Sequence, residues 1–333
     1  MKILVVGCGS IGKRHIRNLK ALSVRDIIAH DVQPERCHEV EREYGIKAYN
    51  DLKDALAQKP GAVLICTPTS LHIPPALSAA RNGCHLFIEK PLSHTLDGID
   101  ELHEIVAQKN LITMVGCNMR FHSGPKKVKE IIDSGLIGRL FSARIQTASY
   151  LPDWRPLQNY KESYSAREDL GGGCVLDCIH EVDLARWYLG DVKSVYSITK
   201  NIGAIDIETE EISEIVCEFR SGVIGSIHLD YISRTYERNN HIIGEKGAIF
   251  WDYRKGTVEV YLADEDKWEV YHQPLNYDTN QMFVDGLSYF ISCVENNQNT
   301  FNDIEEATKT LKFALAIKES TKINMPIKIG GYK

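Results

Sequence analysis

The first twenty-two residues place the strongest constraint on the fold. An apolar run, Ile3–Val6, is followed at once by Gly7-Cys-Gly9-Ser-Ile-Gly12 and then by a helical pattern over 13–22. A strand, a glycine turn and a helix in this order are typical of the first unit of a dinucleotide-binding sheet. Gly7 and Gly9 let the backbone approach phosphate oxygens, and Gly12 permits tight packing of helix on strand.

The same rhythm of short apolar runs and helical patterns continues to about residue 122. It predicts strands at 2–6, 26–31, 62–66, 85–89 and 113–116, and helices near 11–22, 35–44, 51–58, 73–83 and 95–109. Alternating strands and helices indicate a parallel sheet with right-handed crossovers. Ligands bind such sheets at the carboxyl ends of the strands, where the polar motifs of this chain lie.

These strand ends supply the residues that we expect to bind a nicotinamide dinucleotide: Gly7, Gly9, Ser10, Ile11, Gly12, Asp31, Thr67, Pro68, His72, Glu89, Lys90 and Asn118. Asp31 follows Gly12 by 19 residues and can accept both ribose hydroxyls of NAD while repelling the 2′-phosphate of NADP. We therefore expect NAD rather than NADP. Arg36 nearby weakens this expectation, and the alternative for Asp31 is a helix-capping aspartate.

From about residue 138 the pattern changes to strand-like alternation at 140–150, 192–200, 212–219, 223–232, 248–253, 257–262 and 267–271. Turn residues separate these runs, which favours mostly antiparallel pairing. Helical patterns return at 174–189, 279–296 and 303–321, and 151–173 is irregular. We expect an α/β protein with a Rossmann domain at 1–122. A second α/β domain at 123–333 would carry a large, mostly antiparallel open sheet, and the last helix could pack back on the first domain.

Three residues are candidates for proton chemistry. Lys90 ends an apolar strand and could hydrogen-bond or protonate a substrate oxygen. His180 could exchange a proton with a hydroxyl near neutral pH, and Asp177, three positions earlier on the expected helix, would share a face with it. The alternative readings are a surface turn at Glu89–Pro91, a capping aspartate and a structural histidine.

Composition narrows the class of partner. The net charge is −6 without a dense basic patch, which disfavours nucleic acid. The sequence shows neither a membrane-length apolar run nor a signal-peptide pattern, so we expect a cytoplasmic protein. The nine cysteines are scattered, as buried reduced thiols would be. Cys174, Cys178 and His180 raise the possibility of zinc, but a fourth ligand is not apparent, and we expect no metal.

The ordered motifs VVGCGSIGKRH, CTPTSLH, IEKPL, GCNMRF and GGGCVLDCIHEVDL resemble the glucose–fructose oxidoreductase/inositol dehydrogenase/rhizopine-catabolism family of NAD(P)-dependent oxidoreductases. The resemblance implies that Lys90 is the catalytic lysine, His180 the proton acceptor and Asp177 its supporting carboxylate. Many members separate the last two by four positions rather than three. The resemblance also implies that the open sheet mediates dimer or tetramer assembly.

The remaining site residues concern the substrate. We expect contacts from Arg120, Trp154, Arg155, Tyr160, Tyr164, Arg167 and His180. Aromatic faces could stack on a sugar ring, and arginines could bind an anionic group, so an acidic or phosphorylated sugar is favoured over a neutral one. The function expected is NAD-dependent hydride transfer from a hydroxyl of a sugar, amino sugar or nucleotide-linked sugar. The alternatives are a redox-neutral, NAD-retaining epimerase or glycosidase, and a non-catalytic NAD-binding regulator.

Overall fold

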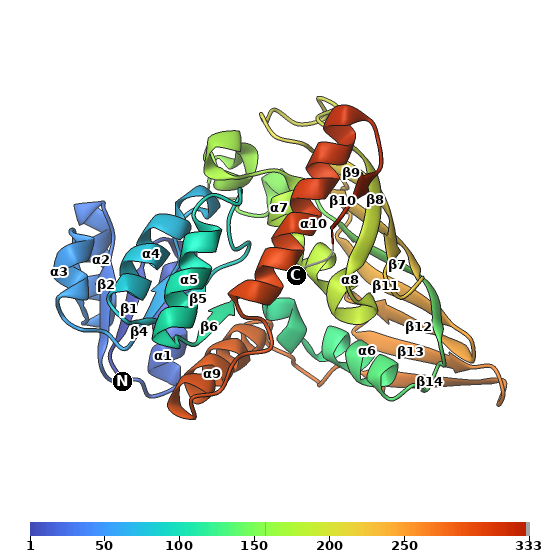
Figure 1. Ribbon diagram of the computed structural model, residues 1–333, viewed down its shortest axis with the longest axis horizontal. Coiled ribbons are helices and arrows are strands. Elements are labelled where there is room, and N and C mark those ends of the chain that lie inside the picture. The colour runs from blue at the N-terminus through green and yellow to red at the C-terminus, as the bar shows by residue number, and fades with distance from the viewer. Residues whose placement is uncertain (157, 331–333) are drawn as a thin grey trace. The chain divides into compact units, whose positions relative to one another are not determined.

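The computed structural model describes residues 1–156 and 158–330, which form two compact units. Unit 1 consists of Met1–Asn118 together with Thr279–Thr308, and unit 2 contains Met119–Asp278 and the chain from Lys309 onward. The division falls within helix α10 (Ile304–Ile323). Figure 1 shows the order of the elements along the chain.

The centre of unit 1 is a six-stranded sheet in the order β3-β2-β1-β4-β5-β6, with every neighbouring pair parallel. The strands are β1 (Ile3–Val6), β2 (Ile27–His30), β3 (Lys47–Tyr49), β4 (Ala62–Ile65), β5 (His85–Ile88) and β6 (Thr113–Val115). The helices are α1 (Ser10–Ala21), α2 (Pro34–Tyr44), α3 (Leu52–Leu56), α4 (Ile73–Arg81) and α5 (Ile99–Lys109). The predicted Rossmann arrangement is confirmed. The inner strands are apolar throughout because helices cover both faces of the sheet.

Unit 1 receives another helix from far along the chain, α9 (Gln281–Glu295). Phe283 of this helix lies 6.3 Å from the His15 ring, and Phe290 lies 5.7 Å from the Phe87 ring. Asn280, which precedes α9, donates its side-chain N–H to Asn18 of α1 at 2.9 Å. The apolar core of unit 1 is therefore completed by residues that follow position 278.

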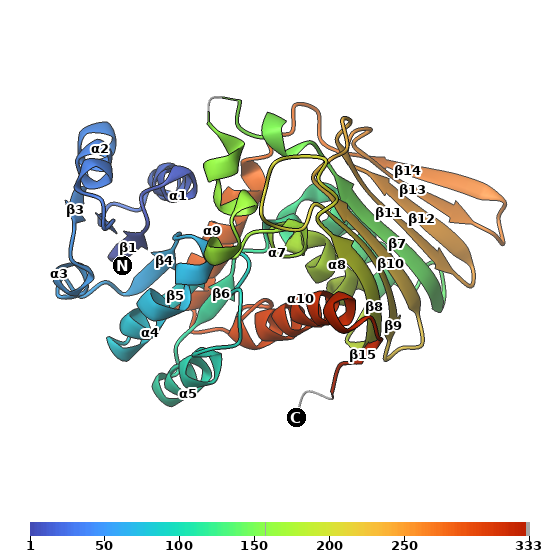
Figure 2. The same cartoon turned by 90° about the horizontal axis from the view of Figure 1, so that it is seen from above.

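Unit 2 is built on a nine-stranded sheet in the order β14-β13-β12-β11-β7-β10-β9-β8-β15. Its strands are β7 (Leu140–Ala148), β8 (Val192–Lys200), β9 (Ile212–Phe219), β10 (Ile224–Asp230), β11 (Glu237–Gly244), β12 (Gly247–Asp252), β13 (Thr257–Leu262), β14 (Lys267–His272) and β15 (Ile327–Lys328). All pairs are antiparallel except β7 with β10, so the expected mixed sheet is confirmed. Figure 2 shows α7 (Cys174–Asp177), α8 (Ile179–Leu189) and α10 along one face, while the other face is bare.

Three features of unit 2 differ from the sequence-based expectation. Helix α6 (Ser123–Asp133) and the central strand β11 were not expected. The single helix predicted over 174–189 is also wrong, because Cys178, with φ −85° and ψ 28°, separates α7 from α8. Asp177 ends one helix and His180 lies in the next, so the argument that they share one helix face does not apply. Among the described residues, no helix is long and apolar enough to span a membrane.

His228 on the bare face gives the sheet a measurable pH dependence. Its ring lies between two carboxylates, with Nε2 2.8 Å from Asp230 Oδ2 and Nδ1 2.6 Å from Glu214 Oε1. Hydrogen bonding to Asp230, and then to Glu214, raises the pKa of His228 from 6.5 to about 9. A raised folded-state pKa stabilises the fold fully below the unfolded value, and this stabilisation is lost as the pH rises toward 9.

We therefore expect the free energy of unfolding of the parent protein to fall by at most about 3 kcal/mol as the pH rises from 6.5 to 9. His228→Gln should abolish this fall. Urea unfolding across this range measures the effect, with His272→Gln on the exposed end of β14 as the control. A parent and a His228→Gln protein that lose stability in parallel would contradict the assignment.

Candidate active site

The glycine turn after β1 has a shape that only glycine permits at two positions. A Cβ at Gly12 would lie 1.8 Å from the Gly7 carbonyl oxygen. Gly7 has φ +95°, and a Cβ there would lie 2.7 Å from the Cys66 carbonyl oxygen, whereas the space beside Gly9 is open to 4 Å. Helix α1 begins at Ser10 without a side-chain cap, so its first amides are available to a ligand. This arrangement fits the pyrophosphate of a dinucleotide.

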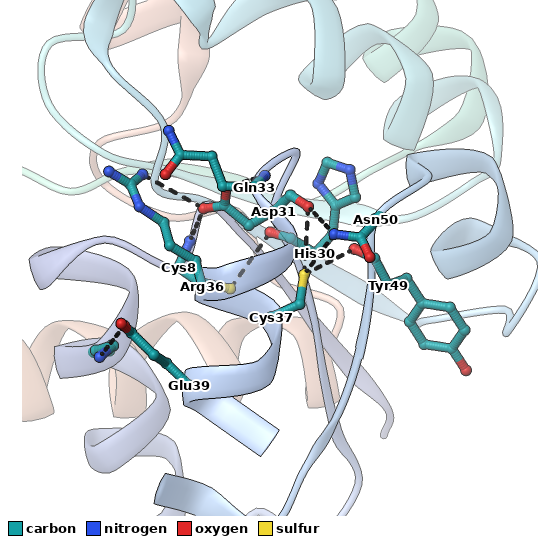
Figure 3. Close-up of polar contacts among 10 residues, drawn as sticks. Cys8, His30, Asp31, Gln33, Arg36, Cys37, Glu39, Tyr49 and Asn50 are labelled. Carbon is teal, nitrogen blue, oxygen red and sulfur yellow. Dashed lines mark hydrogen bonds and ion pairs between the residues drawn. The ribbon is translucent and has the colours of Figure 1, made fainter. Parts of the chain in front are cut away.

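Asp31 is joined directly to this turn (Figure 3). Its Oδ2 accepts the Cys8 N–H at 2.8 Å, and its Oδ1 accepts the Gln33 N–H at 2.9 Å. The Arg36 guanidinium lies 3.6 Å from Oδ2, and the Asn50 amide donates to the Asp31 carbonyl at 3.2 Å. The carboxylate is thus fixed at the end of β2, next to the glycine turn, with a partly exposed arginine beside it.

The thiols near this turn are buried. Burial raises the pKa of Cys8 to about 12, so Cys8 stays an uncharged thiol. All nine cysteines are buried and free of disulfides. In the described ranges, the structure contains no group of three or more histidine, cysteine or acidic residues arranged to hold a metal ion.

The loops after β4 and β5 are connected by His72, whose ring is 1% exposed. Its Nε2 lies 2.9 Å from the Thr67 carbonyl oxygen, and its Nδ1 lies 2.8 Å from the Pro91 carbonyl oxygen. Burial lowers the pKa of His72. The Thr67 hydroxyl donates to Leu71 O at 3.0 Å, which closes the turn that carries Pro68. The ring of His72 therefore binds loop backbone, whereas the sequence had suggested a contact with the cofactor.

Lys90 lies in the loop after β5 and is partly buried. The Glu89 carboxylate before it is buried, and its Oε1 is 2.5 Å from Nε2 of His15 in α1. His15 was not among the expected site residues. A histidine on the buried face of a helix is usually interpreted as a core residue, and the spacing in the sequence does not pair His15 with Glu89. Asn118 is also buried and begins the 3₁₀ turn Asn118–Phe121 after β6.

In unit 2, Asp177 is surrounded by hydroxyl groups. Its Oδ1 accepts the Tyr164 hydroxyl at 2.5 Å, and its Oδ2 accepts the hydroxyls of Ser165 at 2.6 Å and Tyr231 at 3.2 Å. Asp177 and His180 are both buried. Ser165 and Tyr231 were not expected here, although hydroxyl residues near a buried carboxylate are the usual way to satisfy it. The carboxylate fixes the segment after residue 158 to the end of α7.

The aromatic residues expected to contact substrate lie in this segment and just before it. Trp154 is 39% exposed, donates its ring N–H to Ser149 at 2.9 Å and packs edge-on against Tyr231. A small hollow in this region is lined by Leu151, Trp154, Arg155, Gln158, Tyr160, Ser163 and Ser165. Tyr164 is partly buried because its hydroxyl is bound to Asp177.

The three expected arginines lie in different electrostatic environments. Arg120 is buried and donates twice to Asp183, at 2.8 and 2.7 Å. Arg167 is exposed and donates to both carboxylate oxygens of Asp169, at 3.0 and 2.6 Å. The Arg155 guanidinium lies 5.9 Å from the centre of the Tyr164 ring. Carboxylates of the chain thus offset the charges of Arg120 and Arg167.

Two family models match the chain: an oxidoreductase family with an NAD-binding Rossmann fold over residues 1–117, and a GFO/IDH/MocA C-terminal domain over 126–250. Myo-inositol 2-dehydrogenase of Thermotoga maritima is 31% identical, with 99% of this chain and 98% of that protein covered. The chain belongs to the GFO/IDH/MocA family. It is an NAD-dependent oxidoreductase that acts on a CH–OH group, as the motifs in the sequence had suggested.

Two further similar proteins also match this chain over nearly its full length. The NAD-dependent scyllo-inositol 2-dehydrogenase of Bacillus subtilis is 27% identical, with 99% of this chain and 96% of that protein covered. The solved structure of a levoglucosan dehydrogenase in complex with NADH has a TM-score of 0.90 at 20% identity, and each chain is covered completely. This GFO/IDH/MocA fold therefore extends over both units of the protein.

Proposed function

We propose that this family member oxidises one secondary hydroxyl of a cyclic polyol or sugar, with Lys90 and His180 in the chemical step. The position of Lys90 supports its role, because this residue follows β5 at the carboxyl edge of the parallel sheet, where ligands of such folds bind. The position of His180 supports its role as well, because its imidazole is buried near the start of α8.

The roles follow from the chemistry of the two groups. The glycine turn and Asp31 would hold NAD, which would supply the hydride acceptor for the carbinol carbon. The imidazole of His180 takes the hydroxyl proton, and the Lys90 ammonium donates a hydrogen bond that stabilises the developing alkoxide. Asp177 holds the hydroxyls of Tyr164 and Ser165, which orders the neighbouring aromatic segment for a sugar ring.

The arginine contacts favour a neutral ring over the anionic sugar expected from the sequence. An arginine already in a two-point contact with a carboxylate has little net charge to offer a second anion. Arg120 makes such a contact away from water. The two inositol dehydrogenases described above are named for inositols, which are uncharged rings, and this agrees with the preference.

The proposal is tested by following NADH absorbance with matched neutral and anionic rings, for example inositols and uronic acids. We expect the higher kcat/KM with neutral polyols. Bound NAD that turns over substrate without net NADH would instead support the redox-neutral epimerase or glycosidase. If the enzyme clearly prefers the anionic ring and Arg155→Ala abolishes that preference, the substrate is an acidic sugar, as the sequence had suggested.

Cofactor choice gives a separate prediction. Asp31 is buried and held by two backbone amides, so a 2′-phosphate would meet a fixed negative charge. We expect calorimetric titration to show tighter binding of NAD than of NADP, and Asp31→Ser to reduce this difference. Arg36→Ala is the informative control, because loss of that guanidinium should widen the preference for NAD. Equal affinities in the parent protein would contradict the role of Asp31.

We further propose that the protein is a cytoplasmic homodimer or homotetramer assembled through the bare face of the unit 2 sheet. Three exposed aliphatic residues, Ile198, Val216 and Ile224, lie on the β8, β9 and β10 part of this face. Trp268 and Val270 of β14 are about half exposed, at 53% and 49%. Exposed aliphatic and aromatic side chains gathered on one bare sheet face often mark a surface that a partner covers.

For this assembly, Val216→Glu should shift the mass measured by light scattering toward the monomer, because a buried unpaired carboxylate is costly at an interface. Leu275→Glu, at a 96% exposed position in the loop after β14, is the matched control and should leave the mass unchanged. A parent protein that is monomeric at micromolar concentration would rule out the proposed interface.

A further inference from the structure

Lys90 lies between two residues that each contact a buried histidine. The Glu89 carboxylate is 2.5 Å from His15 Nε2, and the Pro91 carbonyl oxygen is 2.8 Å from His72 Nδ1. Each imidazole ring is 1% exposed. The chain on both sides of Lys90 is therefore anchored to a side chain in the interior of unit 1.

Each histidine also connects this loop to another part of the cofactor region. His15 belongs to α1, the helix that begins at the glycine turn. The second nitrogen of His72 lies 2.9 Å from the carbonyl oxygen of Thr67, in the loop after β4. Through these two rings, the loop that carries Lys90 contacts α1 and the Thr67 loop.

The partners of both rings can accept a hydrogen bond from a ring N–H. A carbonyl oxygen only accepts hydrogen bonds, and a carboxylate oxygen is a common acceptor for an imidazole N–H. His15 is flanked by Phe87 at 5.3 Å and Phe283 at 6.3 Å, so a ring without N–H at position 15 would leave the Glu89 carboxylate among apolar groups. A neutral His72 donates to one loop at a time, since only one of its ring nitrogens carries a proton.

We propose that His15 and His72 are positioning residues that together set the place of the Lys90 ammonium. This inference rests on the proposed role of Lys90 in the chemical step. A misplacement of a reacting group by about 1 Å can reduce the rate by about 100-fold, so anchoring both neighbours of one lysine has a direct effect on turnover.

The test is a set of double-mutant cycles with Lys90→Ala. His15→Phe and His72→Phe keep a ring but remove the N–H donors, and His15→Gln and His72→Gln keep a donor. We expect the Phe variants to lower kcat by about 10- to 100-fold with little change in the KM of the polyol, and the Gln variants to lose less. In the Lys90→Ala background, neither substitution should lower kcat further.

The control is His85→Gln at the start of β5, where the ring accepts the Ile112 N–H at 2.9 Å in a purely structural contact. It should leave kcat unchanged. If the Phe variants do not fold, the Gln variants decide through the same cycle. Full kcat in folded His15 and His72 variants, or equal losses with and without Lys90, would overturn the positioning role while leaving the proposed function intact. A Lys90→Ala enzyme of normal rate would overturn both.

Discussion

Lys90→Ala is expected to lower kcat by about 10²- to 10⁴-fold, the range for loss of an acid–base or charge-stabilising group. Binding of NAD should persist, because the glycine turn and Asp31 remain. Stopped-flow or steady-state NADH formation gives kcat, and calorimetry gives the NAD affinity of the same preparation. The matched control is Lys109→Ala in the last turn of α5, which should leave both values unchanged.

His180→Ala should produce a loss of similar size and should also remove the acidic limb of the pH–rate profile, because a protonated imidazole cannot accept the substrate proton. A Lys90→Ala enzyme with near-normal turnover would exclude the lysine from the mechanism. Persistence of the acidic limb in His180→Ala would show that another group is the base.

Asp183→Ala is expected to have the largest effect on stability, a loss of about 3–5 kcal/mol. The carboxylate is completely buried, accepts two N–H groups of Arg120, and lies 3.3 Å from the Thr310 hydroxyl. Without it, the Arg120 guanidinium loses two charge-assisted hydrogen bonds while it stays buried. Calorimetry or circular dichroism should show the melting transition lowered by roughly 10 °C.

The exposed pair of Arg167 and Asp169 provides the comparison. Asp169→Ala removes an ion pair of similar length, yet we expect a much smaller loss of stability than in Asp183→Ala because water screens both charges. The double variant Arg120→Met with Asp183→Leu should recover part of the stability lost in Asp183→Ala, since it buries neither charge. If Asp183→Ala and Asp169→Ala lower the free energy of unfolding by the same amount, burial does not control the strength of these ion pairs.

The sequence predicted most of unit 1 because its central strands are buried on both faces and consist mainly of apolar residues. β3 was not predicted, since Lys47–Tyr49 is too short and too polar to stand out. In unit 2, β11 begins Glu237-Arg-Asn-Asn, which reads as a loop. Arg238 is nevertheless partly buried, and its Nε lies 2.8 Å from the buried Glu181 carboxylate. A partner 57 positions away cannot be read from local pattern.

The candidate site was predicted to a similar extent. The glycine turn, Asp31 and the loop of Lys90 lie at strand ends, where the topology requires them. The contacts that hold them were not predicted, because His15 with Glu89 and His72 with Pro91 depend on which loops meet in space. The break at Cys178 was also missed, since α7 and α8 form one continuous helical pattern in the sequence.

Because α9 is synthesised long after residues 1–118 of unit 1, the order of translation affects how this unit folds. Residues 1–118 leave the ribosome well before Phe283 and Phe290, which cover the rings of His15 and Phe87. At a synthesis rate of about 5–20 residues per second, this interval lasts roughly 10–40 s. During that time the nascent Rossmann sheet has an uncovered apolar flank, the kind of surface that chaperones recognise. A gene fragment that ends at residue 118 would make this exposed state permanent.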